Sequence, residues 1–265
     1  MTLPLSVFII TRDEEMRIGR TLAALNDLAD DILVVDSGST DNTVAIAQSM
    51  RARVIFRAWE GYGQQKQFAE QQCRHRWVLN VDADEVVTPE LAAEIRALFD
   101  PQPPRPGAYN IHILTVYPGD ARPRRFARDY NVVRLYHRAV GAYRPHPSFD
   151  RVELVNVAPA QLNAPLWHYP IVDWHGFIEK LNGFSTFQAS LPSKHSGAML
   201  KLRLVSEFPI NFFKSYILRA HFTGGWKGFY FAFNQAFMRT SRIAKILEAR
   251  ETALNKLPHA TKKDS

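Results

Sequence analysis

The sequence has a single cysteine, Cys73, in 265 residues. One cysteine excludes a disulfide framework and a cysteine zinc site. The chain also lacks an apolar run near the ~20 residues that a bilayer-spanning helix needs, since the longest uncharged run of its last quarter is residues 228–238. No basic segment precedes the apolar start MTLPLSVFII, so this start predicts a first strand and not a signal peptide.

Acidic residues are scarce in the last quarter of the chain. Residues 201–250 contain nine Lys or Arg and two acidic residues, whereas residues 1–200 contain 21 basic and 22 acidic residues. The same quarter is rich in Phe, Tyr and Trp. A basic, aromatic-rich segment beside a nearly neutral body predicts contact with an anionic surface through that segment alone.

Short apolar runs alternate with helical patterns in the first hundred residues. The pattern predicts strands at residues 5–10, 31–36, 53–56 and 78–81, and helices at residues 18–28, 44–47, 62–73 and 88–99. This order implies right-handed crossovers and a mostly parallel sheet flanked by helices. With 46% hydrophobic residues the chain is globular.

The proline-rich segment PQPPRPG, residues 101–107, breaks this pattern and marks a boundary. Longer strands are predicted beyond it at residues 108–117, 132–137 and 152–157. Helices then follow from near Asp173, at about residues 206–220 and at residues 226–247. In the last helix Phe229, Phe233 and Phe237 share one face, and the polar side carries Arg239, Arg242 and Lys245.

Two aspartates, Asp82 and Asp84, follow the fourth predicted strand in the segment RWVLNVDADE. They stand at its carboxyl end, where open α/β sheets bind ligands. Two unpaired carboxylates are costly there, and a divalent cation that carries a diphosphate would neutralise them. The alternative is that both are turn and capping residues before the helix that begins at Thr88.

Several motifs together resemble the inverting family 2 glycosyltransferases of the glycosyltransferase-A fold. They are TRDEE after the first strand, DSGSTDNT after the second and DADE after the fourth. The segments WEGYGQQKQFA, RLYHR, EKLNGFS and FFKSYILRAHFTGGWKGFYFA resemble the branch that adds sugars to the inner core of lipopolysaccharide. The resemblance covers nearly the whole chain.

The resemblance implies an α/β, Rossmann-like catalytic domain and a helical, basic-aromatic extension. Residues 1–100 would be the nucleotide-sugar-binding half, residues 101–172 the acceptor-side half, and residues 173–265 an extension associated with the membrane. The implied reaction is metal-dependent inverting transfer of a hexose or heptose from a nucleotide sugar, with a UDP-sugar favoured, to a lipid-linked glycan. The enzyme would act in lipopolysaccharide core biosynthesis, in the cytoplasm on the inner face of the cell membrane and its anionic surface, without a nucleic-acid partner.

The resemblance also assigns roles to single residues. Asp36 would bind the nucleobase edge, and Thr11 and Glu14 match the nucleoside-binding turn, although Arg12 and Asp13 replace its usual aromatic-asparagine pair. Lys66 would face the donor, with a solvated helix lysine as the alternative. Asp82 would lie on the ribose or metal side, and Asp84 would be the ligand of Mg²⁺ or Mn²⁺. His168, near the diphosphate, is a further candidate ligand, with a hydrogen-bonded core histidine as the alternative.

The catalytic base is assigned to Asp150. Members of the branch carry a Val-His-Asp or Val-His-Glu step, and the segment PHPSFDRVEL keeps Asp150 but has Phe149 where the histidine is expected. Glu153 is the fallback. A haloacid dehalogenase phosphatase would need the DxD pair on the first strand and a later Asp pair, and neither is present. The alternative that stays open is a non-catalytic nucleotide-sugar or membrane-binding module.

Overall fold

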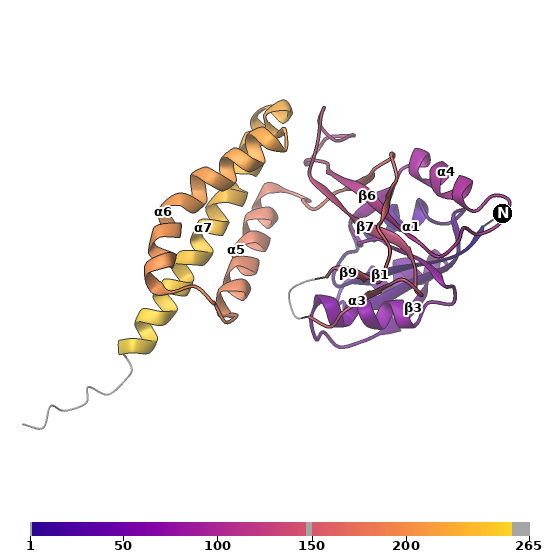
Figure 1. Ribbon diagram of the computed structural model, residues 1–265, viewed down its shortest axis with the longest axis horizontal. Coiled ribbons are helices and arrows are strands. Elements are labelled where there is room, and N and C mark those ends of the chain that lie inside the picture. The colour runs from indigo at the N-terminus through magenta and orange to yellow at the C-terminus, as the bar shows by residue number, and fades with distance from the viewer. Residues whose placement is uncertain (1, 147–149, 256–265) are drawn as a thin grey trace, which may run out of the picture. The chain divides into compact units, whose positions relative to one another are not determined.

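A computed structural model describes residues 2–146 and 150–255, so Phe149 lies outside the described residues. The chain divides into two compact units. The sheet unit comprises residues 1–123 and 128–172, and the helical unit comprises residues 124–127 and 173–265 (Figure 1).

Among the described residues of the sheet unit, nine strands form one sheet in the order β3-β2-β1-β4-β7-β6-β11-β5, with β10 beside β6. The strands are β1 (Leu3–Thr11), β2 (Ala29–Asp36), β3 (Arg53–Phe56), β4 (Trp77–Asn80), β5 (Glu85–Val87), β6 (Ala108–Thr115), β7 (Tyr130–His137), β10 (Ala160–Gln161) and β11 (Leu166–His168). Strands β1 to β4 are mutually parallel, β7 is antiparallel to both β4 and β6, and β11 is parallel to β6. The predicted mostly parallel α/β sheet is confirmed.

The two faces of the sheet are covered by different elements. Strand β1 sends Val7 and Ile9 into one apolar cluster and Phe8 into the other, as alternation along a strand requires. The first cluster includes residues of α1 (Ile18–Ala23), α2 (Thr43–Ser49) and α4 (Pro89–Leu98). The second includes residues of α3 (Tyr62–Gln71) and of the small sheet of β8 (Gly141–Tyr143) and β9 (Val152–Leu154).

Some predicted boundaries are wrong. Helix α1 ends at Ala23, and Leu25 and Leu28 are buried from two successive turns that keep them on the same face. Strand β9 ends at Leu154 and not at residue 157. The chain after Asp84 does not run directly into the helix but forms β5, which pairs antiparallel with β11.

The helical unit contains three long helices. Helix α5 (Trp174–Ser190) begins after Asp173, whose carboxylate accepts a hydrogen bond from the Gly176 amide at 2.8 Å. Helix α6 (Gly197–Phe213) begins earlier than residue 206 because Ser196 caps it, and it passes into the π-helical turn η1 (Lys214–Leu218). A 3₁₀ turn, η2 (His221–Gly224), leads into α7 (Gly225–Asn255), which runs past residue 247.

Helix α7 exposes most of its aromatic stripe. Phe229, Phe233 and Phe237 are 48%, 39% and 47% exposed, and α7 buries Ala232 and Ala236 instead. The aromatic rings are linked by ring contacts to Phe208 and Phe212 of α6, Tyr216 of η1 and Phe222 of η2, and we call the seven together the aromatic face.

The basic residues predicted for the polar side of α7 form bonds within the helical unit. Arg239 pairs with Glu207 of α6, Arg242 donates to Gln188 of α5, and Lys245 donates to several oxygens of α5. Within the described residues, no helix is long and apolar enough to cross a bilayer.

The buried carboxylate of Asp31, on β2, binds side-chain or backbone groups of β1, of β3 and of the segment before β4. It accepts hydrogen bonds from the Ser6 hydroxyl at 2.6 Å, the Arg74 amide at 3.0 Å and the Arg53 guanidinium at 3.1 Å. Burial alone would raise the pKa of Asp31, but these hydrogen bonds outweigh it and lower the pKa below its ordinary value.

We expect Asp31→Asn to lower the free energy of unfolding by about 1–3 kcal/mol, because its partners lose a charged acceptor. Asp27→Asn, at an exposed position, is the control. Since the folded-state pKa of Asp31 is lowered, the contribution of its carboxylate to the free energy of unfolding is complete above about pH 4 and diminishes as the pH falls further. Urea unfolding of the wild type and both variants at neutral and acidic pH measures this. If the difference in unfolding free energy between the wild type and Asp31→Asn grows on acidification, the stabilising role of the Asp31 carboxylate is contradicted.

Candidate functional site

The carboxyl ends of β1, β2 and β4 meet at one edge of the sheet. Thr11 and Asp36, the last residues of β1 and β2, are paired in register. Asp82 and Asp84 follow directly after β4, as predicted. The structure therefore brings these four predicted site residues to the same edge.

Asp36 organises the turn that follows β2. Its Oδ2 accepts hydrogen bonds from the amides of Gly38 at 2.8 Å and Ser39 at 2.9 Å, and its Oδ1 accepts from the Ser39 hydroxyl at 2.5 Å. Gly38 has a φ of +94°, a conformation that glycine adopts without strain. Beside this turn, the buried Oγ1 of Thr11 has no hydrogen-bond partner in residues 2–146 and 150–255.

Glu14 is bonded to an arginine of the same loop. Its carboxylate is 2.5 Å from the Arg17 guanidinium, while its amide donates to the Thr43 hydroxyl at 2.7 Å. Arg17 also lies 3.8 Å from Asp84 and donates to the carbonyl of Pro170 at 3.2 Å. Glu14 thus holds Arg17 between the turn after β1 and the carboxylate of Asp84.

Lys66 is almost fully buried, which rules out the alternative of a solvated helix lysine. Its Nζ lies 2.9 Å from Asp82 and 2.6 Å from Asp150. Burial alone would lower the pKa of Lys66, but the two carboxylates outweigh it and hold the pKa well above its ordinary value. The ammonium is therefore charged and bridges the loop after β4 to the segment that carries the predicted base.

The approach of that segment depends on Gly63 in the first turn of α3. A Cβ at this position would lie 2.4 Å from the carbonyl oxygen of Arg144 and 2.5 Å from the amide nitrogen of His146. The Gly63 amide instead donates to the His146 carbonyl at 2.9 Å. Glycine therefore lets the chain before Asp150 lie directly against α3, one turn away from Lys66.

Arg134 of β7 is a site residue that the sequence analysis missed. Its buried guanidinium donates to Asp82 at 2.8 Å, to Glu85 at 2.7 Å and to the Asn80 side chain. Asp82 thus lies between Arg134 and Lys66. Burial alone would raise the pKa of Asp82, but the two cations outweigh it and hold the pKa far below its usual range. The motif RLYHR contained the arginine, but nothing in it indicated a buried partner.

Asp84 lies beside His168, with 3.3 Å between Oδ1 and Nε2. The pairing of His168 with Glu85 in the antiparallel β11–β5 ladder sets this proximity. Burial alone would lower the pKa of His168, but Asp84 and the neighbouring carboxylates outweigh it and raise the pKa. No group of three or more His, Cys, Asp or Glu gathers to hold a metal in the described part of the chain.

The two candidate bases have different surroundings. Asp150 uses one carboxylate oxygen to bind Lys66 and is 40% exposed at its side chain. Glu153 lies on β9, outside the main sheet, and pairs with Arg144 at 2.5 Å. Only Asp150 is linked through Lys66 to Asp82.

Comparison with known proteins identifies the family. A family model described as glycosyl transferase family 2 matches residues 6–106. A Rickettsia bellii (strain RML369-C) protein described as an uncharacterized glycosyltransferase is 36% identical over 258 residues, covering 94% of this chain and 87% of the relative. The chain belongs to glycosyltransferase family 2. The predicted enzyme class is therefore confirmed, and the phosphatase hypothesis is wrong.

Two further proteins match nearly the whole length of this glycosyltransferase. The lipopolysaccharide core biosynthesis glycosyltransferase LpsC of Rhizobium meliloti (strain 1021) is 32% identical over 274 residues, covering 97% of this chain and 98% of LpsC. The crystal structure of S. aureus TarS 1–349 in complex with UDP-GlcNAc has a TM-score of 0.47 at 16% identity, over 96% of this chain and 92% of that chain. The α/β sheet with its C-terminal helical unit is a fold of the glycosyltransferase-A type.

Proposed function

We propose that this glycosyltransferase transfers a sugar from a nucleotide-sugar donor to a lipid-linked glycan, with inversion at the anomeric carbon. The observation that carries the proposal is the arrangement at the end of β4. Asp84 stands beside His168, and Asp82 is linked through Lys66 to Asp150. This arrangement supplies separate groups for the leaving diphosphate and for the acceptor hydroxyl.

We assign the donor to residues 1–100. Thr11 and Asp36 would contact the nucleoside at the ends of β1 and β2, where the unpartnered Thr11 hydroxyl supports a ligand contact. Asp82 would hold the ribose side. We propose a UDP-sugar as the donor, as the resemblance of the motifs favours.

Asp84 and His168 fit a divalent cation. Their Oδ1 and Nε2 atoms are 3.3 Å apart, close to the roughly 3 Å between neighbouring ligands of an octahedral cation with bonds of about 2.1 Å. Asp82 fits less well, because Lys66 and Arg134 already bind both of its oxygens. When bound, Mg²⁺ or Mn²⁺ would act as a Lewis acid that stabilises the departing diphosphate.

Asp150 is the proposed base. Its second oxygen would take the proton of the acceptor hydroxyl, which attacks the anomeric carbon on the face opposite the diphosphate and so inverts it. Lys66 acts as a positioning residue that fixes the first oxygen. We assign the acceptor side to residues 101–172.

The similarity to LpsC supports lipopolysaccharide core biosynthesis as the pathway and a lipid-linked acceptor. We further propose that the helical unit rests on an anionic membrane surface at the cytoplasmic side. Its aromatic face includes four residues that are 39–50% exposed, Phe222, Phe229, Phe233 and Phe237. Lys201 and Lys214 are exposed in the same unit. Exposed apolar area and positive charge are the features that bind interfacial helices to anionic lipid.

The first test concerns the cation. We expect Asp84→Ala and His168→Ala to abolish the increase in UDP affinity that Mn²⁺ causes, because each variant removes one ligand. Calorimetric titration with UDP in Mn²⁺ and in EDTA measures this, and thermal unfolding checks the fold. Undiminished Mn²⁺-dependent binding by a folded Asp84→Ala protein would overturn the assignment.

The second test separates the two candidate bases. Asp150→Asn keeps the shape of the side chain but cannot accept a proton, so transfer should fall by ~100-fold or more with little change in UDP affinity. Glu153→Gln is the matched control and should transfer at nearly the wild-type rate. Transfer from UDP-sugars to truncated lipopolysaccharide measures both; the reverse result would assign the base to Glu153.

The third test concerns the membrane. The protein should co-sediment with phosphatidylglycerol vesicles at low salt but not with phosphatidylcholine vesicles. Lys201→Glu with Lys214→Glu should weaken this binding about tenfold or more, because each basic residue contributes on the order of 1 kcal/mol. Phe229→Ser with Phe237→Ser should weaken it as well.

The exposed Val155 of the sheet unit provides the control Val155→Ser, which should bind like the wild type. Arg239, Arg242 and Lys245 are not used as test positions because their side chains hold α7 to its neighbours. Binding that is absent, or unaffected by salt and by both double variants, would refute the membrane contact.

A further inference from the structure

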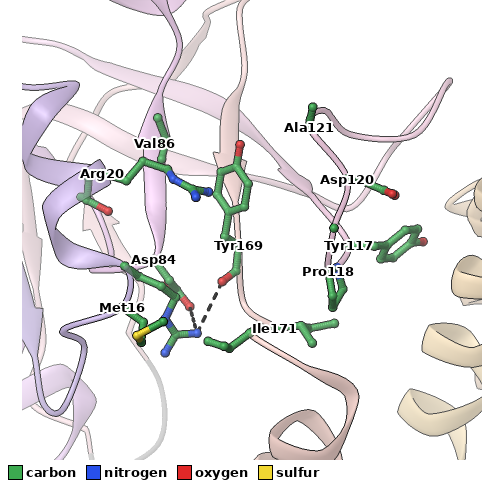
Figure 2. Close-up of a pocket in the computed structure, with 14 residues that line it drawn as sticks. Met16, Arg20, Asp84, Val86, Tyr117, Pro118, Asp120, Ala121, Tyr169 and Ile171 are labelled. Atoms are coloured by element: carbon green, nitrogen blue, oxygen red, sulfur yellow. Dashed lines mark hydrogen bonds and ion pairs between the residues drawn. The ribbon is translucent and has the colours of Figure 1, made fainter.

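A cavity of about 430 Å³ opens beside Asp84 in the sheet unit. This volume lies in the range of small-molecule sites. Its lining comes from α1 and the two residues before it, from the turn after β4 and strand β5, and from the segments that follow β6 and β11. Figure 2 shows Arg20 and Tyr169 on one side of the cavity, with Tyr117, Pro118, Asp120 and Ala121 on the other.

Thr11 and Asp36, the proposed nucleoside contacts, are not among the residues that line the cavity. The sheet order places β6 and β11 on one side of β4, and β1 and β2, which carry Thr11 and Asp36, on the other. Since β6 and β11 run parallel to β4, the segments after them reach the same sheet edge as Asp84. A ligand here would therefore reach Asp84 between these segments and the segment of residues 16–21 after the β1 turn, which lines the cavity as well.

The two arginines of the cavity differ in how they are used. Arg17 is bonded to Glu14 and to the backbone carbonyls of Tyr169 and Pro170. Arg20 is exposed, and its guanidinium lies over the Tyr169 ring at 4.5 Å from the ring centroid. Arg20 makes no ion pair with any residue that the structure describes. Stacking on an aromatic ring restrains the plane of a guanidinium and leaves its N–H groups able to donate hydrogen bonds.

We propose that this cavity binds the acceptor sugar through an anionic substituent, a phosphate or a carboxylate, that Arg20 holds by paired hydrogen bonds. A planar guanidinium matches both groups in a bidentate geometry. The tyrosines, Pro118 and Val86 provide apolar walls, and Asp120 adds a polar contact, a mixture suited to a sugar ring. The inference rests on the proposed function, because it places the acceptor beside the donor site at Asp84.

Binding of small probes tests the cavity without requiring transfer. Mannose 6-phosphate and glucuronate represent the two anionic groups, mannose is the neutral comparison, and inorganic phosphate lacks the sugar. We expect the wild type to bind at least one of the anionic sugars more tightly than mannose and than phosphate in NMR titrations. Arg20→Ala should weaken that binding by about 10- to 100-fold, the loss typical of a charged hydrogen bond.

Further variants distinguish charge from geometry and acceptor from donor. Arg20→Lys should restore only part of the affinity, because lysine keeps the charge but loses the planar stacked group. Arg105→Ala removes an exposed arginine of the loop before β6 and should change nothing. UDP affinity should be the same in Arg20→Ala as in the wild type, and UDP should not displace the anionic sugar.

The inference is overturned if neither anionic sugar binds the wild type, if Arg20→Ala binds them unchanged, or if free phosphate binds equally well. Displacement by UDP, or an equal loss of UDP affinity in Arg20→Ala, would assign the cavity to the donor instead and also overturn it. These outcomes can be distinguished from a failure of the proposed function, which is refuted instead if Asp84→Ala keeps Mn²⁺-dependent UDP binding.

Discussion

Two buried cations, Lys66 and Arg134, hold the acidic loop after β4 in place. Each binds a different oxygen of Asp82, and through them the loop is joined to α3, to β7 and to the segment of Asp150. A buried charge that loses its partner typically costs 3–5 kcal/mol, so these groups are stable only together. The network also constrains the backbone at Asp84, because Asp82 and Glu85 on either side of it are both bound to Arg134.

Much of the sheet could be predicted from the sequence. Strand β3 begins and ends as expected, and the aspartates lie at the end of β4, because short apolar runs between turn residues have few alternative structures. Strand β5 was missed for a physical reason. Three residues after a turn carry no periodicity, and their strand conformation comes from pairing with β11, which lies far along the chain.

The site was predictable in its residue types but not in its pairings. Asp82, Asp84 and Lys66 belong to recognisable segments, yet no local pattern indicates that Lys66 is buried between two carboxylates. Arg134 in an alternating strand would ordinarily face solvent. In α7, helical spacing correctly grouped the aromatic residues, but it could not decide which face would be covered by α5 and α6.

The antiparallel β5–β11 pairing also has a consequence for how the protein folds. It closes a loop from the end of the DADE motif to His168, and Asp84 meets His168 only once this loop is closed. Contacts between residues so distant in sequence form late, because the entropy of a long loop is lost before the contact is gained. A nascent chain that has reached residue 106, where the family match ends, contains the motifs TRDEE, DSGSTDNT and DADE but not Arg134, Asp150 or His168. This edge of the sheet is therefore completed by the part of the chain that is synthesised after the segment that the family model matches.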